Sequence, residues 1–164
     1  MYRVSFTGYR PAKLAFSGES DPRCQALKKR LLKGVTDLAD RGVTEFCSGM
    51  ALGVDIWAAE AVLELKRTRP QVKLIAVIPC PEQDAHWCSA DRERYRSVLS
   101  KCGQKICISP KYTSNCMQKR NRALVDMCDI LIAVFNGKPG GTAQTVHYAE
   151  KVGRKIFTIS PDEL

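Results

Sequence analysis

The sequence has little or none of several features that mark common protein classes. Among its 164 residues, no apolar run approaches the roughly 18 residues that a membrane-spanning helix needs. The N-terminal segment enters a strand pattern directly, without the long apolar stretch of a signal peptide. The eight cysteines include no C-x-x-C pair. We therefore expect a cytoplasmic protein with reduced thiols and no membrane partner.

Several motifs of phosphate, metal and hydrolytic sites are also missing. No Gly-Lys-Ser/Thr occurs, so there is no Walker A loop, and nothing matches G-x-G-x-x-G. Cys80, His86 and Cys88 are metal-binding types, but their spacing fits no common zinc pattern, so we expect no metal. No Ser-His-Asp or Cys-His arrangement can be recognised. Aromatic residues make up only 7%, which leaves few platforms for stacking bases.

The composition is that of a globular protein with an excess of positive charge. Hydrophobic residues account for 45% and charged residues for 26%. The 26 Lys and Arg outnumber the 17 Asp and Glu, and the resulting charge of +9 favours anionic partners such as phosphates or nucleic acid. The length suits one domain over residues 1–164. No linker, repeat or low-complexity tract divides it.

Strand and helix patterns alternate along the chain. The N-cap pair Asp21-Pro22 predicts a helix whose Leu27, Leu31, Val35 and Leu38 form one face and which stops at Gly42. A second helix is indicated by Ile56, Ala59 and Leu63 and ends before Pro70. Further helices are expected over 89–101, 114–127 and 142–152, and strands over 2–7, 44–47, 73–78, 105–108, 130–135 and 155–159. This order predicts a doubly wound α/β fold with a mostly parallel sheet and helices on both faces.

In such folds ligands bind beyond the carboxyl ends of the strands, so the loops there are the place to seek function. Three of these loops are rich in glycine or polar residues: 7–11 (TGYRP), 48–55 (SGMALGVD) and 136–142 (NGKPGGT). Glycines let backbone amides approach a ligand, and a helix N-terminus attracts an anion. The second and third loops therefore favour a phosphate site, to which Ser48 and Thr142 add hydroxyl donors. The alternative is that these glycines only form turns.

Other residues in these loops have two interpretations each. Asp55 stands in the first turn of its helix, where it either caps the helix or binds a ribose hydroxyl. Arg10 either faces the site or is solvated. Trp87 either stacks on a base or packs within its loop. His147 is expected to be structural or exposed.

An ordered set of motifs resembles the bacterial and phage YpsA-like family. The motifs are TGYRP, SGMALGVDIWAAEA, PEQDAHW, the Arg120-Asn121 pair, DILIAVFNG and GGTAQTVHYA, and the similarity runs from Tyr2 to about Pro161. That family belongs to the SLOG superfamily of Rossmann-like proteins, with the LOG phosphoribohydrolases and the DNA-processing protein DprA. The resemblance implies binding of a nucleotide or nucleotide-derived ligand at the glycine loops. We expect a sensor or regulatory protein that needs no cofactor and whose ligand is a nucleotide or an ADP-ribose derivative. The ligand-binding residues expected from the loops and the resemblance together are Thr7, Gly8, Arg10, Ser48, Gly49, Met50, Gly53, Asp55, Glu82, Arg120, Asn121, Gly140, Gly141 and Thr142.

The enzymatic interpretation is weakened by one departure from the LOG pattern. Arg120 resembles the catalytic Arg of those enzymes, but Thr145 stands where their catalytic Glu is expected. Cleavage of an N-glycosidic bond passes through an oxocarbenium-like state that a carboxylate stabilises, so we expect binding rather than hydrolysis. No catalytic residue is assigned. If the chain is an enzyme, it is a nucleoside-monophosphate phosphoribohydrolase in which Asp55, Glu82 or Asp84 replaces that Glu.

A second alternative is binding of single-stranded DNA, because the SGMALGVD segment also resembles a loop of DprA. The aromatic candidates for stacking are Tyr9, Trp87 and Tyr112. The global charge and one shared loop predict at most weak nucleic-acid binding. Self-association into a homo-oligomer stays open.

Overall fold

Six parallel strands in the order β4-β3-β2-β1-β5-β6 form the sheet of the computed structural model, which describes residues 2–164. The strands are β1 (Arg3–Gly8), β2 (Glu45–Ser48), β3 (Lys73–Ile78), β4 (Gln104–Cys107), β5 (Ile130–Val134) and β6 (Lys155–Ile159). Val4 of β1 pairs with Phe46 of β2 on one side and with Ile130 of β5 on the other. β1 therefore lies in the interior of the sheet.

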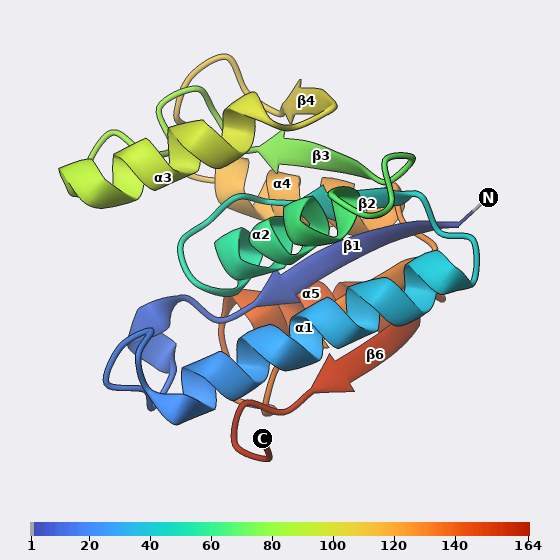
Figure 1. The fold of residues 1–164 in the computed structure, drawn as a ribbon. Helices are drawn as coiled ribbons and strands as arrows, with labels where there is room; N and C mark the ends of the chain where they lie inside the picture. The colour runs from blue at the N-terminus through green and yellow to red at the C-terminus, as the bar shows by residue number, and fades with distance from the viewer. Residues whose placement is uncertain (1) are drawn as a thin grey trace.

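The helices cover both faces of this sheet (Figure 1). α1 (Pro22–Asp40), α2 (Val54–Lys66) and α3 (Ser89–Ser100) lie on one face, and α4 (Cys116–Asp126) and α5 (Gly141–Lys151) lie on the other. This arrangement confirms the predicted fold class. No helix among residues 2–164 is long and apolar enough to cross a membrane.

The direction of strand order reverses beside β1. From β1 the chain moves outward to β4 and then returns to place β5 on the opposite side of β1. The loops after β1 and β5 therefore separate at the carboxyl edge, and a crevice at such a reversal is where open α/β sheets bind ligands.

Local sequence explains why the elements begin and end where they do. The Asp21 carboxylate accepts a hydrogen bond from the Arg23 amide at 2.9 Å and caps α1, with Pro22 as its first residue. Leu27, Leu31 and Val35 are fully buried along its inner face, as predicted. All five residues of β5 are buried because helices cover both faces of the strand. Where the sequence gives bounds for an element, they differ from the observed ones by at most two residues.

Candidate functional site

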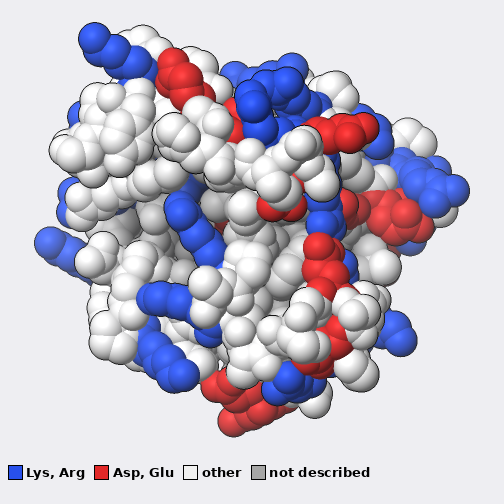
Figure 2. Space-filling view, turned by 90° about the vertical axis from the view of Figure 1, so that its left-hand side faces the viewer, with Lys and Arg blue, Asp and Glu red and all other residues white. Residues whose placement is uncertain are grey.

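A cavity of about 370 Å³ opens at the carboxyl edge of the sheet, where the strand order reverses. Figure 2 looks onto this edge: Lys and Arg side chains flank a hollow on the left, the side of α4 and α5, whereas Asp and Glu gather on the right. The walls come from the end of β1 and its loop, the start of α2, α4 and the start of α5. The lining residues include Thr7, Gly8, Arg10, Lys13, Ala51, Asp55, Met117, Arg120, Asn121, Gly141 and Thr142. Eight of these belong to the fourteen expected ligand-binding residues: Thr7, Gly8, Arg10, Asp55, Arg120, Asn121, Gly141 and Thr142.

Three buried polar side chains face this cavity with unused hydrogen-bonding capacity. Thr7, Asp55 and Thr142 are 6%, 7% and 8% exposed, respectively. Within residues 2–164, neither threonine hydroxyl has a hydrogen-bond partner, and the Asp55 carboxylate accepts only one bond, from the Ala51 amide at 3.3 Å. Because these side chains line the cavity, their free donors and acceptors are available to a polar ligand.

The β5–α5 loop, residues 135–140, leaves the N-terminus of α5 open to the cavity. Gly140 occupies the N-cap position with φ of +146°, which a side chain would strain. Gly141 is exposed, and a Cβ atom on it would meet nothing within 4 Å. The first amides of a helix lack intrahelical acceptors, so those of Gly141 and Thr142 are available to an anion. Lys13, which also lines the cavity, holds this loop by donating a hydrogen bond to the Pro139 carbonyl at 2.9 Å.

Arg120 forms part of the cavity wall and is only 3% exposed. Its guanidinium donates hydrogen bonds to the Gly49 carbonyl, to Gln83 Oε1 at 3.2 Å and to Asn121 Oδ1 at 2.8 Å. Burial lowers the pKa of Arg120, partly offset by the attraction of Asp55. Burial also raises the pKa of Asp55, against the attraction of Arg120. The attraction between these two groups therefore offsets part of the cost of burying each of them beside the cavity.

The β2–α2 loop, residues 49–53, lies behind the cavity, and of these five residues only Ala51 lines it. Ser48 Oγ donates to the Asp55 carbonyl at 2.8 Å and accepts from the Met50 amide at 3.1 Å. Gly53 has φ of +90° and packs against the Tyr9 carbonyl, which also accepts from the Val54 amide at 3.3 Å. Met50 is fully buried. Ser48 and Gly49 thus hold Asp55 and Arg120, and neither they nor Met50 and Gly53 line the cavity.

The loop after β3 contributes support rather than cavity wall. Glu82 is exposed and does not line the cavity. Asp84 is buried and pairs with Arg96 at 3.3 Å. Trp87 packs edge-on against Tyr95 of α3, with ring centroids 5.1 Å apart. Of the two interpretations of Trp87, the structure therefore favours packing over stacking on a base. No cluster of metal-ligating side chains occurs among residues 2–164.

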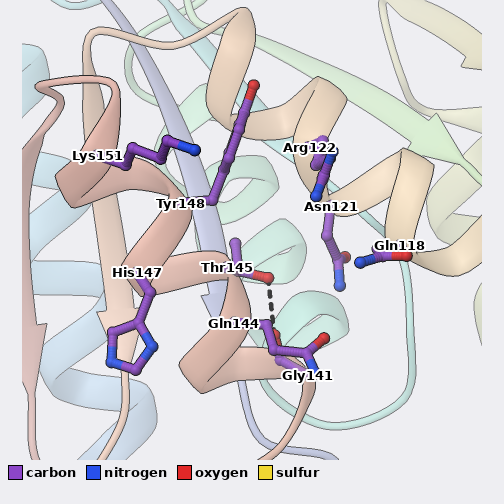
Figure 3. Close-up of a pocket in the computed structure, with 9 residues that line it drawn as sticks. All are labelled: Gln118, Asn121, Arg122, Gly141, Gln144, Thr145, His147, Tyr148 and Lys151. Carbon is purple, nitrogen blue, oxygen red and sulfur yellow. Dashed lines mark hydrogen bonds between the residues drawn. The ribbon is translucent and has the colours of Figure 1, made fainter.

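A groove of about 320 Å³ between α4 and α5 adjoins the cavity, and Asn121 and Gly141 line both (Figure 3). Its other lining residues are Gln118, Arg122, Gln144, Thr145, His147, Tyr148 and Lys151. Sequence reasoning did not identify this groove. The signal was present in the spacing of Gln144, Tyr148 and Lys151, which places them on one side of the predicted helix.

Comparison with known proteins identifies relatives of this chain. A family model described as YpsA, YspA SLOG family, matches residues 4–164. UPF0398 proteins of Bacillus thuringiensis and Bacillus cereus are each 32% identical over 153 residues, covering 92% of this chain and 83% of the relative.

Two solved structures share the fold at lower identity. DprA from Streptococcus pneumoniae is 21% identical with a TM-score of 0.66, and DprA from Helicobacter pylori, described as binding single-stranded DNA, is 22% identical with a TM-score of 0.69. Both alignments cover 96% of this chain, but they span only 50% and 64% of the respective DprA chains. At this identity the likeness establishes the fold alone.

Proposed function

We propose that this chain, which belongs to the YpsA SLOG family, binds a nucleotide or nucleotide-derived phosphate ligand in the cavity at the carboxyl edge of its sheet. The observation that carries the proposal is the set of buried, incompletely hydrogen-bonded side chains, Thr7, Asp55 and Thr142, in the cavity that the N-terminus of α5 enters. Such a site offers donors and an acceptor to a ligand that has both an anionic group and hydroxyl groups.

The distribution of charge suggests how the ligand lies. Its phosphate would accept hydrogen bonds from the amides of Gly141 and Thr142 and from the Thr142 hydroxyl. The ribose hydroxyls would reach the Asp55 carboxylate, which accepts only the Ala51 amide in the present structure. Arg10 and Lys13 are exposed at the mouth and would attract the anion.

Binding is tested by thermal unfolding with AMP and ADP-ribose as probes. A ligand at about 100 times its dissociation constant adds roughly 2.7 kcal/mol to the free energy of unfolding, which raises the melting temperature by several degrees. Gly141→Asp should abolish the shift because it places a carboxylate in the anion site. The fold should survive, since Gly141 has open space around its Cβ position and an acidic residue suits a helix N-terminus.

The control is Ser97→Asp, which adds the same charge to the exposed face of α3. This variant should respond to the probes as the unchanged protein does. The absence of any shift in the unchanged protein at millimolar probe would contradict the proposal.

We infer that the site senses its ligand rather than hydrolyses it. Thr145, at the position of the missing carboxylate, donates its hydroxyl to the Gly141 carbonyl at 2.8 Å and cannot carry a stabilising negative charge. Incubation with AMP should release little or no adenine, as measured by chromatography. Efficient release that Arg120→Ala abolishes would overturn this inference. Asp55 would then be the first acid to replace, by Asp55→Asn, because it lines the cavity while Glu82 and Asp84 do not.

Single-stranded DNA is a second candidate, favoured by the likeness to DprA and by the charge of +9. We expect a long DNA oligonucleotide without a 5′ phosphate to bind weakly. Its affinity should fall steeply between about 50 and 200 mM salt, because the interaction rests on surface charge and counterion release. Gly141→Asp should barely change it. Tight binding at physiological salt in fluorescence anisotropy, lost on replacing Arg10, Lys119 and Arg122 together, would make DNA the partner.

A further inference from the structure

The ligand cavity continues into the groove between α4 and α5. Both hollows are lined by Asn121 and Gly141, so they adjoin at the N-terminus of α5, and a ligand anchored there lies beside the groove. The groove, at about 320 Å³, is nearly as large as the cavity, at about 370 Å³. A single nucleotide seated in the cavity would leave the groove unused.

The chemistry of the groove changes along its length. Near Gly141, the carboxamides of Gln118 and Gln144 face the opening and make no hydrogen bond to any other residue of the described chain (Figure 3). Further along stand the cations Arg122 and Lys151, and none of the nine lining residues is acidic. Carboxamides donate to and accept from sugar hydroxyls and base edges, and the cations suit a phosphate.

Tyr148 is fixed between these two cations. The guanidinium of Arg122 lies 5.2 Å from its ring centroid, and its hydroxyl donates to Asp126 Oδ1 at 2.7 Å. In Figure 3 the ring stands upright, with Lys151 on one side and Arg122 on the other. The ring therefore holds the two positive charges in place, with Arg122 over one of its faces.

The distances along α5 separate the two anionic positions. With a rise of about 1.5 Å per residue, Tyr148 and Lys151 lie roughly 10 and 15 Å from Gly141 along the helix axis. Helical side chains lean toward the N-terminus, which brings the Lys151 ammonium back toward the middle of the groove. A phosphate at Gly141 is too distant to contact these cations, whereas a second phosphate, one nucleotide further along, is within their reach.

We propose that the groove binds a second nucleotide unit, so that the preferred ligand is a linear, 5′-phosphorylated dinucleotide rather than a mononucleotide. The 5′ phosphate binds at the N-terminus of α5, and the first ribose lies at Asp55 in the cavity. The ligand then enters the groove, where Arg122 and Lys151 contact the phosphodiester group and the carboxamides contact the second nucleoside. This inference rests on the proposed function of the cavity. The same chemistry occurs in a free dinucleotide and at the 5′ end of a longer strand.

Calorimetric titration at physiological salt with AMP, the dinucleotide pApA and 5′-phosphorylated tetra-adenylate tests this assignment. We expect pApA to bind about tenfold more tightly than AMP, because it gains a charge-assisted contact with two cations. In the Arg122→Gln/Lys151→Gln variant, pApA should bind about as AMP does, while the affinity for AMP stays within about twofold. The charge-conserving variant Arg122→Lys/Lys151→Arg should keep most of the preference for pApA.

Lys29→Gln/Arg30→Gln is the matched control, since it removes two positive charges from the exposed side of α1 and should leave the preference intact. Equal binding of AMP and pApA, unchanged in the groove variant, would overturn the groove assignment and leave the cavity proposal standing. Failure of both probes to bind would overturn the cavity proposal itself. Tetra-adenylate binding like pApA supports a dinucleotide-sized site, and a further tenfold gain would overturn that size limit.

Discussion

The two glycine-rich loops of this protein follow β2 and β5, the strands on either side of β1, but have different roles. In the β2–α2 loop, Gly53 packs under the Tyr9 carbonyl, and that carbonyl accepts the amide of Val54, the first residue of α2. In the β5–α5 loop, Gly141 faces open space, and no residue of the described chain accepts its amide or that of Thr142. The first loop is closed by the protein itself, whereas the second is open to a ligand.

The comparison shows that glycine content after a parallel strand does not by itself define an anion site. What decides is whether another part of the chain already uses the amides at the helix N-terminus. The closed loop contributes to the site indirectly, because its Gly49 carbonyl holds Arg120 at the cavity wall.

The largest expected effect comes from removing the group that ties the closed loop to α4. Arg120→Ala leaves the Gly49 carbonyl and Gln83 Oε1 without their donor and removes the stronger of the two cations that attract the buried Asp55 carboxylate. We expect the free energy of unfolding to fall by about 3–5 kcal/mol in urea denaturation.

Adding Asp55→Asn should recover part of this loss, because the neutral amide leaves no unpaired buried charge. A double-mutant cycle should give a coupling of at least about 1 kcal/mol between the two positions. Strictly additive losses would show that Arg120 and Asp55 do not depend on each other.

A pair of alanine substitutions compares the two loops directly. In Gly53→Ala, the new Cβ would lie 2.7 Å from the Tyr9 carbonyl oxygen, and φ is +90°, so the free energy of unfolding should fall by about 3 kcal/mol. Gly141→Ala meets no atom within 4 Å and should change it by no more than about 0.5 kcal/mol. Similar losses in both variants, measured by urea denaturation, would contradict the distinction between a closed and an open loop.

The sequence predicted the elements well because their signals are local. The cap at Asp21, the helical spacing of Leu27, Leu31 and Val35, and the continuous apolar run of β5 each act within a few neighbouring residues. The order of elements then determined the fold class and the edge of the sheet at which to seek a site.

The roles of individual loop residues were less predictable because they depend on distant partners. The SGMALGVD and NGKPGGT loops are both glycine-rich, and only the Tyr9 carbonyl, from the loop after β1, shows that the former is closed. The contact of Arg120 with Gly49 joins residues 71 positions apart. The groove requires α4 and α5 to pack side by side, which no single helix pattern specifies.

The smallest effect concerns the segment before α1, which ion pairs of Glu19 join to α1 and α3. Glu19 accepts hydrogen bonds from Arg94 at 2.6 and 2.9 Å and pairs with Lys28, and the Arg94 guanidinium lowers the pKa of Glu19 to about 2. Because this pKa is below its unfolded value of 4.5, the stabilisation is complete above pH 4.5 and is lost as the pH falls toward about 2.

The Glu19 side chain is 42% exposed, so solvent screening reduces its contribution to about 1 kcal/mol at neutral pH. Glu19→Gln should therefore be less stable than the unchanged protein at pH 7 by about that amount, and the difference should vanish near pH 2 in urea denaturation series. A difference that stays constant across this range would show that packing of the Glu19 side chain, and not its ion pairs, is the source of the stabilisation.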